Sequence, residues 1–258
     1  MCYDVKYLTQ KKLNYAKRLG ESVDEIKKIE SDLNILTTNL SPHYHASGFM
    51  HPNLLCFIKK PEIKPMLFQW GLIPYWTKNE EQASQIQNKT INARIESIDT
   101  KPSFKSSSNK RRCIVMIDGF YEHHHQNNQK YPFYIYNKTD EPMLIGGLWD
   151  SWNTTHGYVL NTVSIITTKA QGIMKSIHNN PKLSESRMPL LINSAQINNW
   201  LSPTPIAQIL KDITENNDYL NLKAHPVKPL RGKNYVGNYI EVSYPYEYPE
   251  LNITGLLS

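Results

Sequence analysis

The stretch Arg112–Phe120, which reads RCIVMIDGF, decides the fold class because it has the pattern of a buried β-strand. Further strands are predicted on either side of it, at Leu54–Ile58, Lys64–Trp70, Pro132–Tyr136, Met143–Trp149, Tyr158–Thr167, Met188–Ile192 and Tyr219–Val227. A doubly wound α/β fold would alternate strands with helices, whereas this region has few helices between its strands. We therefore expect an α+β fold, with a mostly antiparallel sheet or partly closed β-barrel and peripheral helices.

Helices are predicted at both ends of this strand-rich region. Apolar residues recur at steps of three or four between residues 9 and 36, which is the spacing of a helix face packed on a core, and Gly20 is a candidate break. Ser194–Leu201 and Pro205–Lys211 are expected to form two further helices. Residues 101–112 are basic and rich in serine, so we expect a mobile, solvated loop there, with a phosphate contact as the alternative.

The composition is that of a folded chain without a linker. The chain has 258 residues, 40% of them hydrophobic, and its 16 Tyr, 6 Phe and 5 Trp exclude disorder of the whole chain. We expect one domain at residues 1–240 and a tail at residues 241–258 that packs on it. The apolar runs are too short to span a bilayer and no secretory signal is visible, so we expect a cytoplasmic protein without membrane contact.

The net charge and the number of cysteines exclude few classes of function. The net charge of +6 is a mild preference for polyanions. The 3 cysteines are typical of a reducing compartment, and Cys56 and Cys113, which lie in apolar strands, are expected to be core thiols.

Cys2 differs from the other cysteines because removal of Met1 would make it the first residue. Methionine aminopeptidases remove the initiator when the second residue is small, as cysteine is. The free α-amine, with a pKa near 8, would attack an aldehyde to give a Schiff base, and the thiol would close a thiazolidine ring. Alternatively the thiol alone would act as an acyl-transfer nucleophile, or Cys2 would belong to a frayed, unreactive terminus.

Three adjacent histidines, His123, His124 and His125, precede the run Gln-Asn-Asn-Gln. Neighbouring side chains of an extended chain point to opposite sides, so these rings cannot easily converge on one metal ion. We expect a polar hairpin loop here and no metal. The sequence also has no glycine-rich phosphate loop, and we expect no cofactor.

Six motifs occur in one order along the chain. They are Cys2; Phe68–Pro74 (FQWGLIP); Ile91–Glu96 (INARIE); Asp118–Glu122 (DGFYE); Ile177-His178 with Arg187-Met188-Pro189; and His225-Pro226-Val227 with Val236-Gly237-Asn238. Together they resemble the SOS response-associated peptidase (SRAP) family, from residue 2 to about residue 240. Members of this family shield abasic sites in single-stranded DNA through a covalent DNA–protein crosslink. The resemblance therefore implies an abasic-site sensor that acts in the DNA damage response.

The resemblance implies four catalytic residues. The amine and thiol of Cys2 would trap the aldehyde of the ring-opened sugar as a thiazolidine, and Asn92 would orient Cys2. Glu122 would be the general acid/base for Schiff-base formation and for the peptidase-type self-processing that removes Met1. His178 would protonate the sugar ring oxygen and help to reverse the crosslink.

The resemblance also implies which residues contact DNA, and which form of DNA the protein binds. Arg94 and Arg187 would pair with phosphates beside the lesion, since a guanidinium matches phosphate oxygens. Trp76 and Pro74 would stack on or wedge against bases, and Thr167 would hydrogen bond to a phosphate. The partner would be single-stranded DNA with an abasic site, bound by a monomer that associates with the nucleoid.

This chain departs from the family pattern at two places. The family usually begins Cys-Gly-Arg, whereas Tyr3 and Asp4 follow Cys2 here, and an acidic residue near a phosphate would weaken DNA binding. The segment between His178 and Arg187 is also longer, with Asn179–Ser186 inserted. Two other functions stay open: a cysteine peptidase or amidase that uses the Cys2 thiol, and a non-catalytic module that binds single-stranded DNA.

Overall fold

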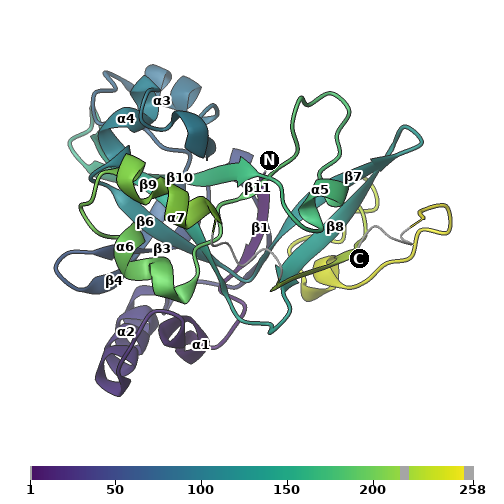
Figure 1. The fold of residues 1–258 in the computed structure, drawn as a ribbon, viewed down its shortest axis with the longest axis horizontal. Coiled ribbons are helices and arrows are strands. Elements are labelled where there is room, and N and C mark those ends of the chain that lie inside the picture. Colours follow the sequence, from purple (N-terminus) through teal and green to yellow (C-terminus); the bar gives the residue numbers. More distant parts are fainter. Residues whose placement is uncertain (1, 216–220, 253–258) are drawn as a thin grey trace.

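The computed structural model describes residues 2–215 and 221–252, and Figure 1 shows two sheets with helices around them. The strands are β1 (Asp4–Tyr7), β2 (His43–Ser47), β3 (Asn53–Lys59), β4 (Ile63–Trp70), β5 (Asn92–Arg94), β6 (Arg112–Ile117), β7 (Gly119–Gln126), β8 (Gln129–Asn137), β9 (Met143–Asn153), β10 (Val159–Lys169), β11 (Arg187–Pro189) and β12 (Leu222–Pro226). The α-helices are α1 (Lys12–Lys17), α2 (Val23–Leu36), α3 (Glu80–Gln87), α4 (Pro102–Ser108), α5 (Met174–Ile177), α6 (Ile197–Trp200) and α7 (Ile206–Glu215). Short 3-10 helices include η1 (Gly48–Met50), η2 (Ile95–Ser97) and η5 (Ile240–Ser243). The predicted α+β class is confirmed.

Five strands close into a barrel in the order β4-β3-β6-β9-β10, and β10 pairs back with β4. All pairs in this ring are antiparallel except β10 with β4, where Val163 lies opposite Trp70. β10 continues past the ring and pairs with β5 and β11. The predicted closure of the sheet into a barrel is confirmed, and β10 fixes where the site residues of β5 and β11 lie.

The second sheet is antiparallel throughout, in the order β12-β8-β7-β1-β2. The prediction of one strand over residues 112–120 is wrong, because the chain leaves the barrel after β6 and enters the second sheet at β7. Asp118 lies at this junction, and its carboxylate accepts hydrogen bonds from the Thr9 N–H at 2.8 Å and the Tyr15 hydroxyl at 2.7 Å. A continuous apolar pattern does not reveal such a change of sheet.

The helix break predicted near Gly20 is confirmed, since α1 and α2 are separate helices. Ser22 begins α2 with a capping box, in which its side chain and that of Glu25 each bind the other residue's backbone N–H. Ile29 and Leu33 are the buried residues of α2 and lie one turn apart on the face that packs on the core.

The prediction of a mobile loop at residues 101–112 is wrong. Most of this segment forms α4, and Pro102 stands in its first turn, where helices tolerate proline. Phe104, Ser107 and Ser108 are buried, and the carbonyl oxygen of Ser108 accepts a hydrogen bond from the Arg112 guanidinium. A count of serine and basic residues does not show that one face of the segment packs on the barrel.

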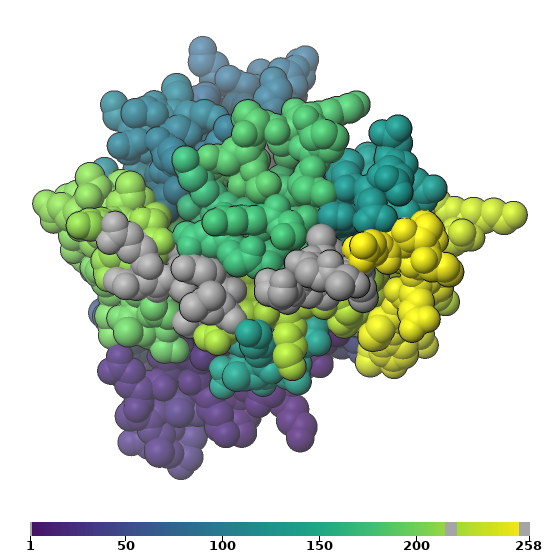
Figure 2. Space-filling model, turned by 45° about the vertical axis from the view of Figure 1, so that its right-hand side comes forward, coloured from purple at the N-terminus to yellow at the C-terminus, as the bar shows by residue number. Residues whose placement is uncertain are grey.

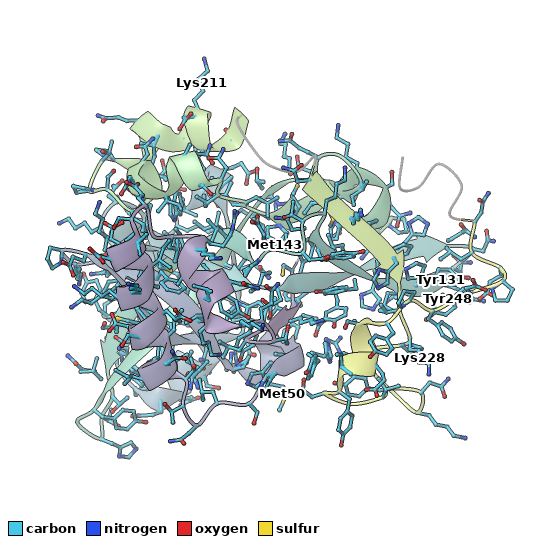
Figure 3. The ribbon with its side chains drawn as sticks, turned by 90° about the horizontal axis from the view of Figure 1, so that it is seen from below. Met50, Tyr131, Met143, Lys211, Lys228 and Tyr248 are labelled. Atoms are coloured by element: carbon cyan, nitrogen blue, oxygen red, sulfur yellow. The ribbon has the colours of Figure 1, made fainter. Side chains whose placement is uncertain are left out.

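The C-terminal segment lies against the second sheet. The Tyr246 N–H donates to the Pro226 carbonyl oxygen at 2.9 Å, and the Tyr248 hydroxyl donates to the Val227 carbonyl oxygen at 2.8 Å. Figure 3 shows Tyr248 beside Tyr131, and the two ring centroids are 5.0 Å apart. Residues 253–258 of the predicted tail, and the start of the strand predicted at Tyr219, lie outside the described residues. The domain boundary at residue 240 stays a prediction.

Within the described residues, no helix is long and apolar enough to cross a membrane.

Candidate functional site

Cys2 comes just before β1, a strand of the second sheet that Figure 1 shows near the middle of the molecule. Its side chain is buried, with 1% of the residue exposed. The Cys2 carbonyl oxygen accepts a hydrogen bond from the Asn92 side-chain amide at 2.8 Å, and the Tyr3 carbonyl oxygen accepts one from the Gly48 N–H at 2.7 Å. Cys2 therefore has a fixed position and does not belong to a frayed end.

The surroundings of the Cys2 thiol do not activate it as a thiolate. Burial raises the pKa of the Cys2 thiol well above its ordinary value, and the nearby charge of Glu122 raises this pKa further. Reactive cysteines instead have a lowered pKa, beside a cation or a helix N-terminus. The thiol of Cys2 is thus protonated in this site.

Asn92 lies in β5, which pairs with β10 of the barrel, so its contact with Cys2 connects the barrel to the N-terminal segment. Its Nδ2 binds the Cys2 carbonyl, while its Oδ1 is buried and has no hydrogen-bond partner among the described residues. A buried acceptor without a partner is costly, so this oxygen favours a donor from a bound molecule. Asn92 and Arg94 both lie in β5, whereas Glu96, two residues further along the chain, lies in η2.

Glu122 of β7 and His178, which follows α5, face each other. The Nε2 atom of His178 lies 3.7 Å from Oε2 of Glu122, which is longer than a direct hydrogen bond. Nδ1 of His178 accepts a hydrogen bond from the backbone N–H of Arg187 at 3.0 Å. Because Nδ1 is the acceptor, the neutral ring carries its proton on Nε2, on the side of Glu122.

The pKa values of Glu122 and His178 are shifted in the directions that favour the neutral form of each group. Burial lowers the pKa of His178 to about 4, and burial raises the pKa of Glu122 above its ordinary value. A neutral imidazole can donate the Nε2 proton, and a carboxyl group with a raised pKa can take up and release a proton closer to neutral pH. The pair therefore has the properties of general acid/base groups.

Three hydrogen bonds dock α5 and the residue after His178 on β7. The His124 ring binds the Ser176 carbonyl oxygen through Nδ1 at 2.9 Å. The side-chain amide of Asn179 accepts from the His125 N–H at 2.7 Å and donates to the His125 carbonyl oxygen at 2.9 Å. These contacts set the distance between His178 and the strand that carries Glu122.

A cavity of about 420 Å³ opens over Glu122 and His178. Tyr3, from the N-terminal segment, lines one part of it, and Lys130 and Arg231 also line it. The entrance to the two acid/base groups thus carries two basic side chains, which suits an anionic ligand.

The prediction of a polar hairpin loop at the three histidines is wrong, because all three lie in β7. His124 is buried, whereas His123 and His125 line the cavity. The turn that follows is formed by Asn127 and Asn128, which both have positive φ angles, of 50° and 62°. Burial lowers the pKa of His123 to about 4, so its ring is neutral at physiological pH.

Asp4, the acidic residue where the family has arginine, is neutralised within the protein. Its carboxylate lies 3.1 Å from the Arg231 guanidinium and 3.1 Å from Nε2 of His45. Burial alone would raise the pKa of Asp4, but the hydrogen bond from His45 and the charge of Arg231 outweigh it and lower this pKa. Asp4 therefore places less negative charge at the cavity than its sequence position suggests.

Arg187 is buried, with 2% of the residue exposed; both Nη atoms of its guanidinium bind acceptors, while Nε has no hydrogen-bond partner among the described residues. It contacts both carboxylate oxygens of Glu96 at 2.9 Å, Glu185 at 2.8 Å and the Thr167 carbonyl oxygen at 2.7 Å. Thr167 is also fully buried. In this state neither residue faces solvent, so their phosphate contacts remain predictions that would require these side chains to move.

Of the other predicted DNA contacts, Arg94 and Trp76 lie at the surface and Pro74 is buried. Arg94 is exposed at the end of β5, while Pro74 is buried in the loop after β4. Trp76, with 38% exposed, lines a hollow together with Lys105 and Lys110 of the α4 region. A basic hollow with an exposed indole is a suitable surface for a stacked base and its phosphate.

Sequence reasoning missed Lys130 and Arg231 as residues of the site. Both lie far along the chain from Cys2, and neither is part of the motifs that carry the family resemblance. Asp4 was the one available signal for Arg231, because a carboxylate in a buried strand needs a charged partner.

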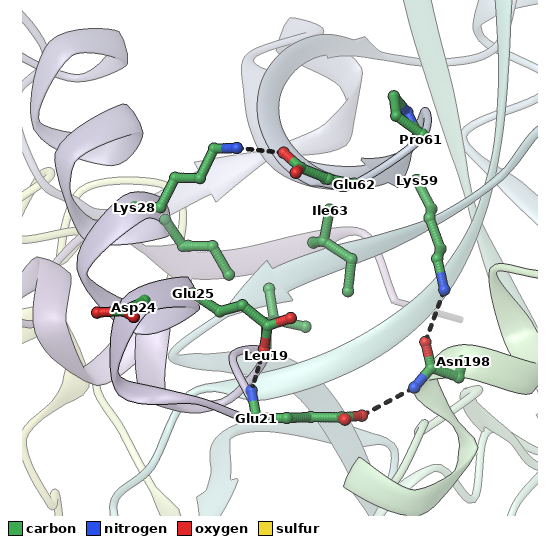
Figure 4. Close-up of a pocket in the computed structure, with 11 residues that line it drawn as sticks. Leu19, Glu21, Asp24, Glu25, Lys28, Lys59, Pro61, Glu62, Ile63 and Asn198 are labelled. Atoms are coloured by element: carbon green, nitrogen blue, oxygen red, sulfur yellow. Dashed lines mark hydrogen bonds and ion pairs between the residues drawn. The ribbon is translucent and has the colours of Figure 1, made fainter.

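A second cavity, of about 480 Å³, lies between α2 and the β3–β4 hairpin (Figure 4). Its polar side chains bind one another: Lys28 pairs with Glu62, and Asn198 accepts from Lys59 and donates to Glu21. These mutual contacts leave little for a ligand to bind.

Among residues 2–215 and 221–252, no group of three or more His, Cys, Asp or Glu side chains is arranged to hold a metal ion.

Comparison with known proteins identifies the family. The sequence model described as SOS response associated peptidase (SRAP) matches residues 1–233. This chain belongs to that family. The abasic site processing protein YoqW of Bacillus subtilis (strain 168) is 35% identical over 192 residues, which cover 72% of this chain and 81% of YoqW.

More distant proteins agree with this assignment. The abasic site processing protein HMCES of Xenopus tropicalis is 33% identical over 186 residues, and the match spans 63% of this chain and about half of HMCES, 52%. The crystal structure of a Bacteroides thetaiotaomicron protein superposes with a TM-score of 0.76 and 26% identity, covering 95% of this chain and 100% of that one. The fold is therefore that of known structures.

Proposed function

We propose that this protein processes abasic sites in single-stranded DNA, as a monomer, by forming a covalent thiazolidine between Cys2 and the aldehyde of the sugar. The observation that carries the proposal is the set of contacts around Cys2: Asn92 binds its carbonyl oxygen, and the next residue, Tyr3, lines the same cavity as Glu122 and His178. The relatives named abasic site processing proteins support the coarser part of the proposal, the processing of abasic sites.

The reaction begins with opening of the sugar. The Nε2 proton of neutral His178 is transferred to the ring oxygen as the bond between this oxygen and C1′ breaks. The C1′ hydroxyl loses its proton, which returns to His178, and C1′ becomes an aldehyde. A raised pKa lets Glu122 take the proton that the attacking α-amine of Cys2 loses, and then return it to the departing hydroxyl as water. The product is a Schiff base between Cys2 and C1′.

Ring closure uses the thiol. The sulfur of Cys2 attacks the Schiff-base carbon, its proton passes to the nitrogen, and the five-membered thiazolidine forms without oxidation or reduction. The raised pKa of the thiol favours this order, since the amine is then the better first nucleophile. The same raised pKa speaks against a cysteine peptidase that would begin with a Cys2 thiolate.

The amine must be free for this chemistry, so the proposal includes removal of Met1, with Glu122 as the acid/base of self-processing. Met1 lies outside the described residues. Intact mass of the Glu122→Gln protein, produced in a host with little methionine aminopeptidase, tests this step: retained Met1 supports self-processing, and complete removal contradicts it.

The main test is the mass of the protein after incubation with single-stranded DNA that carries one abasic site. The protein should gain the mass of the DNA minus one water and form a heat-stable adduct, and Cys2→Ala should form none. The matched control is Cys113→Ala, since Cys113 is a buried core thiol. An adduct of unchanged yield from Cys2→Ala would contradict the proposal.

A further inference from the structure

The segment Asn179–Ser186, which sets this chain apart from its family pattern, lies beside the polar β7–β8 hairpin. The Asn179 amide joins them through its two hydrogen bonds to the backbone of His125. Figure 2 shows the segment around residues 170–190, in green, next to the teal hairpin. They form the two walls of a second hollow that begins where the site cavity ends.

This hollow is continuous with the cavity over Glu122. Its volume is about 450 Å³, and His125, Lys130 and Asn180 line both spaces. Lys182 of the inserted segment and Asn127 of the hairpin turn line its outer part. A trench therefore runs from the acid/base groups, between the hairpin and the inserted segment, toward the hairpin tip.

The charged side chains that line this trench are mostly basic. Lys130, Lys182 and Arg231 line it, and among its described lining residues Glu122 is the one carboxylate. Lys130 and Lys182 are exposed, and within the described residues neither has an ion-pair partner. Burial lowers the pKa of His125 as well, which favours its neutral ring, so the positive charge of the trench comes from the lysines and Arg231 and not from the histidines. Amide groups of asparagine supply further donors that any phosphate or base can use.

We propose that this trench binds the DNA strand on one side of the abasic site, with Lys130 and Lys182 as phosphate contacts. The inference rests on the proposed function, since it takes the cavity over Glu122 as the position of the lesion. The trench leaves this cavity in one direction, so it holds one flank of the lesion and not the other. It also supplies positive charge that this chain lacks at Asp4.

The test compares two single-stranded oligonucleotides of equal length. In one the abasic site has a long flank on its 5′ side, and in the other on its 3′ side. The Lys130→Ala, Lys182→Ala double variant should slow adduct formation about three- to tenfold with one of them, at DNA concentrations below saturation, and leave the other at the wild-type rate. The control variant, Lys17→Ala with Lys27→Ala, removes the same charge from exposed positions of α1 and α2.

Non-covalent binding gives an independent readout. In the Cys2→Ala background, the double variant should reduce the slope of log affinity against log salt by about 1 to 1.5, because each phosphate contact on a single strand contributes about 0.7. An unchanged slope, or equal slowing with both oligonucleotides, would contradict the proposal that the trench binds one flank of the lesion. If the wild-type protein forms no adduct with either oligonucleotide, the proposed function fails, while the salt slope still reports on the two lysines.

Discussion

The backbone N–H of Arg187 donates a hydrogen bond to Nδ1 of His178 at 3.0 Å, and this contact decides which ring nitrogen carries the proton. With Nδ1 occupied as an acceptor, the proton of the neutral ring is on Nε2, which lies 3.7 Å from Glu122. The inserted segment Asn179–Ser186 separates His178 from Arg187 in sequence, but the chain folds back over this segment so that the two residues are in contact. The acid/base pair thus depends on β11 as well as on α5 and β7.

Acid should destabilise the protein through His178. Its pKa is lowered to about 4 by burial, whereas an unfolded histidine titrates near 6.5. Between these values the unfolded chain binds more protons than the folded one, so the free energy of unfolding falls as the pH falls. We expect His178→Gln to lose about 1–2 kcal/mol less than the wild-type protein between pH 7 and pH 5. Urea unfolding at both pH values measures this, and equal losses would contradict it.

Asn179 should position His178. Replacing it with alanine removes both hydrogen bonds to the His125 backbone, at a cost of about 1–2 kcal/mol in docking of the segment. We expect Asn179→Ala to slow adduct formation about tenfold at saturating DNA, where binding no longer limits the rate. Asn179→Asp, which keeps the acceptor for the His125 N–H, should recover part of the rate.

The control for Asn179 is Asn198→Ala. Asn198 also makes two hydrogen bonds, to Lys59 and Glu21, but it lies at the second cavity of Figure 4. This variant should keep the wild-type rate. Equal slowing by both variants would mean that the effect of Asn179 is a general loss of stability.

Much of the fold follows from the sequence, and the exceptions have physical causes. The helix break near Gly20 is visible because the apolar spacing and the glycine agree. The division at Asp118 is not visible, since both β6 and the start of β7 are apolar and buried. The serines of α4 look solvated in sequence, although Ser107 and Ser108 pack against the barrel.

The site was predictable only in part, for a different reason. Cys2, Asn92, Glu122 and His178 are distant in sequence, and a shared family pattern is what suggested that they meet. Arg231 belongs to no such pattern, because its role follows from its contact with the Asp4 carboxylate. Long-range partners of this kind require the fold.

The pair Asp4 and Arg231 should couple in stability and in DNA binding. Arg231→Ala leaves the buried Asp4 carboxylate with His45 as its remaining partner, and should lower the free energy of unfolding by about 1 kcal/mol, since the Arg231 side chain is largely exposed. Because the pKa of Asp4 is lowered, this contribution is present at neutral pH and is lost as the pH falls through that pKa.

A double-mutant cycle separates the two effects. Asp4→Asn should strengthen binding to abasic single-stranded DNA, because it frees the Arg231 charge for a phosphate, and Asp4→Asn with Arg231→Ala should abolish this gain. Binding is measured by fluorescence anisotropy in the Cys2→Ala background. No gain from Asp4→Asn would show that Arg231 does not face the DNA.

Trp76 should contribute base stacking that does not depend on the lesion. Trp76→Ala should weaken binding by about 1–3 kcal/mol, equally for intact and abasic strands. Tyr158→Ala is the matched control, because Tyr158 is an exposed aromatic residue in the β9–β10 turn, outside the proposed DNA surface. A loss confined to abasic strands would contradict simple stacking and would place Trp76 at the lesion.

Arg187 offers the sharpest test between a phosphate contact and a structural ion pair. In this state its guanidinium is held by Glu96, Glu185 and the Thr167 carbonyl oxygen. Arg187→Met should leave Glu96 without its partner and Glu185 with Lys169 alone, and should lower stability by about 2–4 kcal/mol. If the role is structural, Arg187→Lys lowers the melting temperature and slows adduct formation, while the salt slope of DNA binding stays at the wild-type value. Glu96→Gln should then cause a similar but smaller loss of stability, because Glu96 is partly exposed. A phosphate contact predicts the opposite pattern: the salt slope falls by about 0.7 in Arg187→Met, and Glu96→Gln strengthens DNA binding by freeing the guanidinium.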